Sequence, residues 1–162
     1  MPTGLLLIHA FPLDASMWQP QVEGLGIDLP IVAPDMPGFG SAAGVGDATT
    51  MDAMADACVA ALKSAGVDRA IICGLSMGGY VALAMLRNHR SMVAGLVLAN
   101  TRAGADDEAG KGRRADLAAR LRAEGSAFLV ASPPPLLSAD APAGLMDQVK
   151  GIIAKQSAEG IA

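Results

Sequence analysis

The residues best suited to chemistry lie in the run G-L-S-M-G at positions 74–78, where Ser76 stands between two glycines. A short apolar segment at residues 70–73 precedes this run, and residues 79–87 follow it with an apolar period typical of a helix. The pattern predicts a strand, a sharp turn and a helix, with the serine hydroxyl exposed at the apex. A chance match in a chain with 19 glycines is the alternative, and the flanking strand and helix favour the motif.

The two glycines have a steric role in such a turn. The serine backbone is strained there, and side chains two positions before and after it would collide with the neighbouring strand and helix. Gly74 and Gly78 remove these side chains. The first amides of the new helix have no partner within the helix and lie at its positive end. The N–H of Met77 is therefore expected to stabilise a tetrahedral oxyanion formed at Ser76.

Length and charge narrow the class of protein. The 162 residues suffice for one domain with a hydrophobic core. The formal net charge is -4 and no basic stripe is present, so we expect no nucleic acid partner. The N-terminus carries no positive charge before its apolar run, and no uninterrupted apolar run reaches the roughly 20 residues that cross a bilayer. We predict a cytoplasmic protein that does not contact a membrane.

No residue pattern indicates a metal or a cofactor. Cys58 and Cys73 are isolated in the sequence, which predicts two small buried hydrophobic residues and no disulfide. No pair of histidines and no carboxylate cluster has metal-ligand spacing. The run G-F-G at 38–40 does not open a helix after a strand, as a dinucleotide-binding motif would.

The remaining segments predict the elements that position the serine turn. Strands are expected at residues 4–9, 29–33 and 93–99, a short helix at 18–25, and a helix ending at Ser64 with Thr49 and Asp52 as a capping box. Strands that alternate with helices predict an α/β fold, a mainly parallel sheet flanked by helices. If strand 29–33 and the strand before Ser76 lie on opposite sides of strand 4–9, the loop that carries His9 and the turn that carries Ser76 face each other across one crevice at the carboxyl ends of the strands.

The chain changes character after Asn100. Acids at 106–108 and bases at 113–122 predict a solvated helix, which the prolines at 133–135 end. A second helical segment carries an apolar stripe at 145–153, and the sequence does not show what this stripe covers. We expect residues 1–100 to form the core and residues 101–162 to form a helical lid over the crevice.

Three motifs in chain order resemble the α/β-hydrolase superfamily. They are H-A-F-P at 9–12, P-D-M-P-G-F-G at 34–40 and G-L-S-M-G-G at 74–79. The resemblance covers the first 100 residues and implies a partial α/β-hydrolase fold followed by the start of a helical lid. Ala10 stands where glycine is commoner in the family.

The resemblance also implies a role for each matched residue. Ser76 corresponds to the nucleophile, at the turn known as the nucleophile elbow. The backbone N–H groups of Phe11 and Met77 correspond to the oxyanion hole. His9 corresponds to a residue that braces the oxyanion loop and does not act as a base, and the two glycines of the elbow, Gly74 and Gly78, support the turn.

The general base and the acid of such a triad have no clear counterpart here. The family places both after the serine, and only His89 follows Ser76. A helix rising ~1.5 Å per residue would carry His89 roughly 18 Å away, so we expect a surface histidine. Asp106 and Asp107 follow the strand that carries the acid in some relatives, and the alternative is that they start a solvated helix. Asp35 is expected to form a turn.

Strands that family members usually have before and after this region have no counterpart in the sequence. We therefore expect a truncated chain that lacks the triad acid and base and is nearly inactive by itself. Its open sheet edges predict possible self-association.

The implied function is a serine hydrolase that acts on a small ester or lactone through an acyl-enzyme. The run L-L-L-I-H-A-F-P-L-D at 5–14 is most similar to 3-oxoadipate enol-lactonases and small carboxylesterases. A cofactor-free haloperoxidase or perhydrolase, which would use the same serine, is an alternative. A non-catalytic protein that binds small molecules, or an inert fragment, is another. A substrate carboxylate would need a cation, and we expect Arg102, Arg113 and Arg114 to be solvated on the lid.

Overall fold

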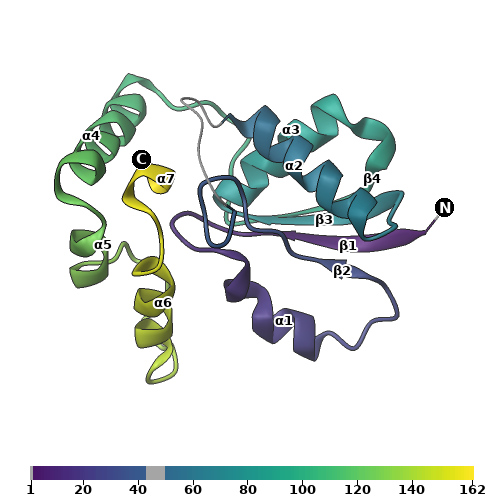
Figure 1. The fold of residues 1–162 in the computed structure, drawn as a ribbon, viewed down its shortest axis with the longest axis horizontal. Helices are drawn as coiled ribbons and strands as arrows, with labels where there is room; N and C mark the ends of the chain where they lie inside the picture. Colours follow the sequence, from purple (N-terminus) through teal and green to yellow (C-terminus); the bar gives the residue numbers. More distant parts are fainter. Residues whose placement is uncertain (1, 43–49) are drawn as a thin grey trace.

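Four apolar strands form one parallel sheet in the order β2-β1-β3-β4. The strands are β1 (Thr3–Ile8), β2 (Ile31–Val32), β3 (Arg69–Leu75) and β4 (Val93–Ala99). The computed structural model describes residues 2–42 and 50–162 (Figure 1). The second and third strands flank the first, so the predicted reversal of winding between β1 and β3 is confirmed. The predicted α/β class is confirmed as well.

Helices cover both faces of this sheet. On one face lie α2 (Met51–Ser64) and α3 (Met77–Asn88), and on the other η1 (Ala15–Trp18) and α1 (Gln19–Gly24) (Figure 1). A short turn of 3-10 helix, η2 (Arg90–Met92), leads into β4. The apolar stripe of α2 faces the sheet, with Cys58 and Leu62 fully buried. The hydrophobic core therefore lies between the sheet and the α2–α3 pair.

The start of α2 differs from the prediction by one residue. Thr50 is the N-cap, and its hydroxyl accepts a hydrogen bond of 3.1 Å from the amide of Ala53. The predicted cap, Thr49, lies outside the described residues. Either threonine satisfies the capping preference by type, and the tertiary position of the helix decides between them.

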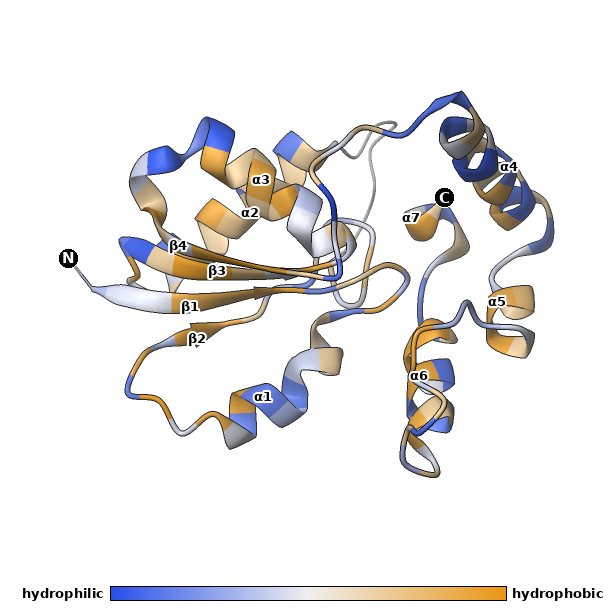
Figure 2. Ribbon diagram, turned by 180° about the vertical axis from the view of Figure 1, so that it is seen from behind, coloured by the Kyte–Doolittle hydropathy of each residue, from blue (hydrophilic) through white to orange (hydrophobic). Residues whose placement is uncertain are grey.

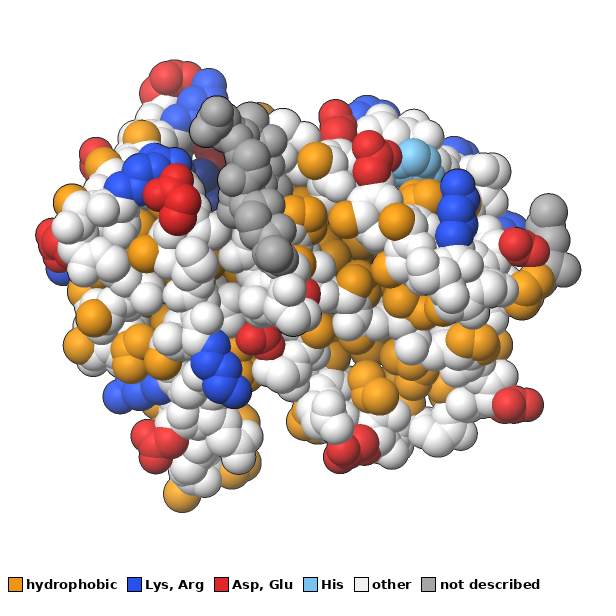
Figure 3. Space-filling view, in the orientation of Figure 1, with side chains coloured by type: hydrophobic (Ala, Val, Ile, Leu, Met, Phe, Trp, Pro, Cys, Tyr) orange, Lys and Arg blue, Asp and Glu red, His pale blue; other side chains and the backbone are white. Residues whose placement is uncertain are grey.

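Four further helices lie at the carboxyl end of the sheet (Figure 1). They are α4 (Glu108–Glu124), α5 (Ala127–Ala131), α6 (Leu145–Ile153) and α7 (Ala158–Ile161). The polar surface of α4 contrasts with the apolar strands (Figure 2), and its charged side chains stand out on the molecular surface (Figure 3). The prolines predicted to end the first of these helical segments follow α5.

The structure shows what the apolar stripe of α6 covers, which the sequence left open. Val149 and Ile153 are buried, and α6 packs against η1 and α5. The sequence pattern showed the stripe but not its partner, because η1 lies about 130 residues earlier in the chain.

Hydrogen bonds also join the C-terminal helices to the core. The Gln156 side-chain amide donates to the Asp14 carboxylate over 2.9 Å, and its carbonyl oxygen accepts from the amide of Gly40 over 2.9 Å. A Cβ at Gly160 would lie 2.1 Å from the carbonyl oxygen of Gly38. The C-terminal segment therefore packs closely on the loops that follow β1 and β2.

Candidate active site

Ser76 lies at the apex of the turn between β3 and α3. Its backbone has φ 53° and ψ −111°, in a region that non-glycine residues rarely adopt. Two contacts with the end of β4 hold this conformation. The Ser76 amide donates to the carbonyl of Ala99 over 3.0 Å, and the Thr101 hydroxyl donates to the carbonyl of Ser76 over 2.8 Å. The strained turn is therefore supported from a second strand.

The glycines around Ser76 are required by the closeness of three backbone segments. A Cβ on Gly74 would lie 2.3 Å from the carbonyl oxygen of Gly78, and one on Gly78 would lie 2.2 Å from that of Ile8. A Cβ on Gly79 would lie 2.4 Å from the side chain of Thr101. No Cβ fits at such distances unless the backbone moves, so this turn depends on glycine at these positions.

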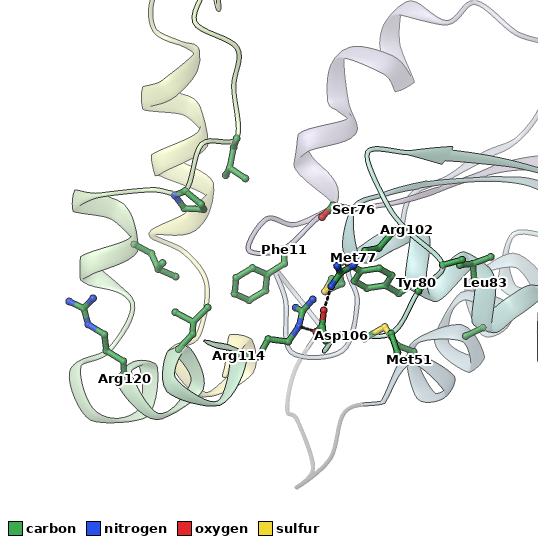
Figure 4. Close-up of a pocket in the computed structure, with 18 of the residues that line it drawn as sticks. Phe11, Met51, Ser76, Met77, Tyr80, Leu83, Arg102, Asp106, Arg114 and Arg120 are labelled. Carbon is green, nitrogen blue, oxygen red and sulfur yellow. Dashed lines mark hydrogen bonds and ion pairs between the residues drawn. The ribbon is translucent and has the colours of Figure 1, made fainter. Parts of the chain in front are cut away.

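Ser76 lines a cavity of about 1250 Å³ together with Phe11 and Met77 (Figure 4). Phe11 follows β1 and Met77 begins α3, so residues of two separate segments line the cavity beside the serine. Within residues 2–42 and 50–162, neither amide donates a hydrogen bond to a protein acceptor. Neither N–H group is therefore occupied by a contact within this part of the chain.

His9 is fully buried and uses both ring nitrogens in structural contacts. Its Nε2 accepts from the Met36 amide over 3.0 Å, so its Nδ1 carries the proton and donates to the carbonyl of Ala10 over 3.2 Å. Burial lowers the pKa of His9, outweighing the opposite influences of the Ala10 carbonyl, Asp35 and Asp14. The ring is therefore neutral and ties the loop after β1 to the loop after β2.

His89 lies at the C-terminal end of α3, whereas Ser76 precedes its first residue. Its Nε2 is 2.7 Å from the Asp56 carboxylate of α2. This pairing agrees with the prediction that His89 is a surface residue remote from the serine. These are the two histidines of the sequence, and both have structural partners.

Asp35 forms a turn, as expected. Its carboxylate accepts hydrogen bonds from the amides of Ala15 (2.8 Å) and Ser41 (2.7 Å). Burial would raise the pKa of Asp35, but the hydrogen bonds from Ser41 and Ala15 outweigh it and hold the pKa below its usual value. Asp35 thus organises the loops beside His9.

The two aspartates after β4 have different roles. Asp107 caps α4 by accepting from the Gly110 amide over 2.7 Å, which confirms the predicted helix start. Asp106 lines the cavity and pairs with Arg114 and Arg102. The hydrogen bond from Arg114, opposed by desolvation, holds the Asp106 pKa below its usual value.

Arg102 and Arg114 are exposed, as expected, and both also line the cavity, which the sequence did not indicate. Arg113 is exposed, as expected, and does not line it. The four-residue spacing of Arg102 and Asp106 was the available sequence signal for an ion pair. The position of α4 beyond the carboxyl end of the sheet, which brings Arg114 to the same carboxylate, had no signal in the sequence.

The described residues contain no group of three potential metal ligands. None of their helices has the length and hydropathy to cross a membrane.

Comparison with known proteins agrees with this geometry. The sequence profile of a family described as "Alpha/beta hydrolase family" matches residues 5–158. The pimeloyl-[acyl-carrier protein] methyl ester esterase of Aromatoleum aromaticum is 36% identical over 97 residues, which are 60% of this chain and 36% of that protein.

Two solved structures extend the likeness to the whole fold. A thermophilic esterase from Thermogutta terrifontis, described as malate bound, has a TM-score of 0.88 and 36% identity, and the match covers 99% of this chain and 62% of that one. The enol-lactonase from Burkholderia xenovorans LB400 has a TM-score of 0.87, 24% identity and the same coverage, a likeness of fold. The chain thus spans less than two thirds of the length of these relatives.

Proposed function

This chain belongs to the alpha/beta hydrolase family, and we propose that it hydrolyses a small carboxylic ester or lactone through an acyl-enzyme on Ser76. The observation that carries the proposal is the conformation of Ser76, whose φ of 53° places it at a strained apex on the cavity wall. Structural proteins gain nothing from such strain, whereas a nucleophile needs an exposed and fixed hydroxyl.

The chemistry then follows from the three groups on the cavity wall. The Ser76 oxygen attacks the carbonyl carbon, and the amides of Phe11 and Met77 stabilise the negative charge on the carbonyl oxygen. The tetrahedral intermediate collapses, expelling the alcohol and leaving an acyl group on Ser76. Water then attacks the acyl group and releases the acid. We propose that α4–α7, as a lid, limit the access of bulk water to these steps.

A base must take the serine proton, and the two histidines of the chain are both engaged elsewhere. We propose that the base and its acid partner come from a segment outside these 162 residues. Loss of a triad base lowers turnover by about a millionfold, and an oxyanion hole alone retains roughly 10³ to 10⁴ over water. We therefore expect very slow turnover from the chain alone.

Free imidazole tests this proposal because it can replace a missing histidine base. The cavity, at about 1250 Å³, has room for imidazole beside a short ester. With p-nitrophenyl butyrate, turnover should rise in proportion to imidazole concentration in the wild-type chain. The Ser76→Ala variant should show only the reaction of imidazole in buffer. Mass spectrometry of the digested chain should find the butyryl group on the peptide that contains Ser76.

Three results would contradict the proposal. Imidazole-dependent turnover that survives Ser76→Ala would exclude this nucleophile. Fast turnover without imidazole that is lost in His89→Ala would show that the chain supplies its own base. A chain that neither turns over nor becomes acylated at any imidazole concentration would support a binding protein or an inert fragment instead.

A further inference from the structure

Four arginines line the cavity beside Ser76, although the protein as a whole is acidic. The charged side chains on the described cavity wall are those of Arg87, Arg102, Arg114, Arg120 and Asp106. The formal net charge of the chain is -4. One carboxylate among four guanidinium groups gives this wall an excess of positive charge.

Arg102 and Arg114 share a single carboxylate, that of Asp106. One carboxylate oxygen accepts from Nη2 of Arg102 and the other accepts from Nε of Arg114 (Figure 4). The side chain of Asp106 is 16% exposed, whereas those of Arg102 and Arg114 are 57% and 62% exposed. A partly buried anion thus pairs with two exposed cations that line the cavity, and the cluster keeps one positive charge in excess.

The other two arginines each have a carboxylate of their own. Arg87 pairs with Asp52, and Arg120 pairs with Glu124 over 3.0 Å and stacks on Phe128. Among the described residues, the uncompensated charge of the wall therefore lies at the Arg102–Asp106–Arg114 cluster.

Arg114 is oriented for binding an anion. Its Nε–H donates to Asp106, and its guanidinium carbon lies 5.9 Å from the centre of the Tyr80 ring. Contact with Asp106 through Nε does not use the two terminal amino groups of Arg114, a residue that lines the cavity. A guanidinium fixed in this way binds a second carboxylate with less loss of side-chain freedom than a mobile one.

We propose that Arg102 and Arg114 form a carboxylate-binding subsite, so that the preferred ester carries a carboxylate separated from the scissile carbonyl by an apolar chain. The apolar part suits Leu83, Leu117 and Phe128, which line the same cavity. This inference rests on the proposed ester hydrolysis at Ser76. It adds to that proposal the charge that the preferred substrate carries.

Binding to the Ser76→Ala chain tests the subsite without turnover. Isothermal titration calorimetry would compare monomethyl adipate with dimethyl adipate, which differ by one carboxylate. A second pair, 4-acetoxybutanoate and its methyl ester, carries the carboxylate on the alcohol half of the ester. We expect the anion to bind at least tenfold more tightly than its neutral partner in one pair or in both, and the pair that shows the preference identifies the half that carries the charge. Higher salt should reduce the preference.

Substitution of the arginines assigns the preference to the cluster. Arg114→Gln and Arg102→Gln should each weaken binding of the preferred anion about tenfold and leave binding of the neutral ester unchanged. Arg113→Gln is the matched control, because Arg113 is the exposed neighbour on α4 that does not line the cavity. A thermal melt of each variant separates loss of folding from loss of binding.

Equal affinity for anion and neutral ester in both pairs would overturn the subsite. So would a loss of anion binding in Arg113→Gln equal to that in the other two variants. Failure of all four esters to bind would overturn it as well. The subsite and the hydrolysis can fail separately. A charge preference without imidazole-dependent turnover would contradict only the proposed hydrolysis. Turnover without a charge preference would contradict only the proposed subsite.

Discussion

Ser76 has an uncommon backbone conformation because three parts of the chain meet around it. Its own turn supplies the glycines, the loop after β1 passes within contact of Gly78, and the end of β4 bonds to both the amide and the carbonyl of Ser76. The conformation is therefore a tertiary property, although the residues that permit it are adjacent in the sequence.

At this scale we predict that Gly78→Ala destabilises the protein by about 3 kcal/mol, because the new Cβ would lie 2.2 Å from the carbonyl oxygen of Ile8. Urea unfolding followed by circular dichroism measures the change. The control is Gly112→Ala in α4, where nothing lies within 4 Å of the new Cβ. That variant should be more stable by about 0.5 to 1 kcal/mol. Equal stability of the two variants would show that the contact with β1 is not tight.

His9 gives a pH prediction at the same scale. Its folded-state pKa lies below the ordinary 6.5 because it is buried, so the unfolded chain binds more protons as the pH falls below that value. Stability should therefore decrease as the pH falls from about 6.5 toward the folded-state pKa. His9→Gln should flatten this part of the profile, measured by urea unfolding at several pH values.

Asp35 provides the contrast within the same experiment. The folded-state pKa of Asp35 is lowered from 3.8. Its contribution to the free energy of unfolding is therefore present above that pH and is lost at lower pH. This loss of stability at acidic pH should persist in His9→Gln. If the free energy of unfolding of His9→Gln changes with pH between 5 and 6.5 as steeply as that of the wild type, the buried, neutral state of His9 is contradicted.

At the scale of elements, the C-terminal helices contact the core through few but specific interactions. Gln156 is 4% exposed and connects the segment after α6 to Asp14, itself 7% exposed, and to the loop after β2. Val149 and Ile153 add apolar burial. The proposed lid is therefore anchored at a buried polar contact next to the loop that carries Phe11.

We predict that Gln156→Ala destabilises the chain by about 1–3 kcal/mol, because the buried carboxylate of Asp14 and the amide of Gly40 lose a partner. Gln148→Ala, at an exposed position of α6, is the matched control and should change stability by less than about 0.5 kcal/mol. Chemical unfolding of both variants checks the difference. If the two changes are equal, Gln156 does not hold the segment in place.

At the scale of the whole molecule, the sheet has an unpaired edge at β4 within the described residues. Val97 and Leu98 are 48% and 44% exposed, although β4 has the composition of a buried central strand. Exposed apolar side chains are also visible on the half of the molecule that contains the sheet (Figure 3). Such an edge can pair with another chain. The cytoplasmic location and the lack of a nucleic acid partner stay predictions from composition.

We predict that the chain self-associates through β4 and that Leu98→Lys reduces the association, because a charge at an open edge disfavours strand pairing. Sedimentation velocity over a range of concentrations measures it. Leu25→Lys, equally exposed at 44% but located after α1, is the control and should associate like the wild type. A wild-type chain that stays monomeric at high concentration would contradict the prediction.

The sequence by itself determined the elements and the turn that carries Ser76. Its apolar runs and helical periods are local properties, and the order of β1, β3 and β4 along the chain leaves few right-handed parallel arrangements. The position of Ser76 between Gly74 and Gly78 is equally local as a pattern, although the contact that requires Gly78 comes from Ile8 of β1.

Only the tertiary structure decided the contacts between distant segments. Arg114 reaches the cavity because α4 lies at the carboxyl end of the sheet, Gln156 meets Asp14 across 142 residues of chain, and the α6 stripe is covered by η1. No period or spacing in a sequence records such contacts, since they depend on how whole elements pack in space.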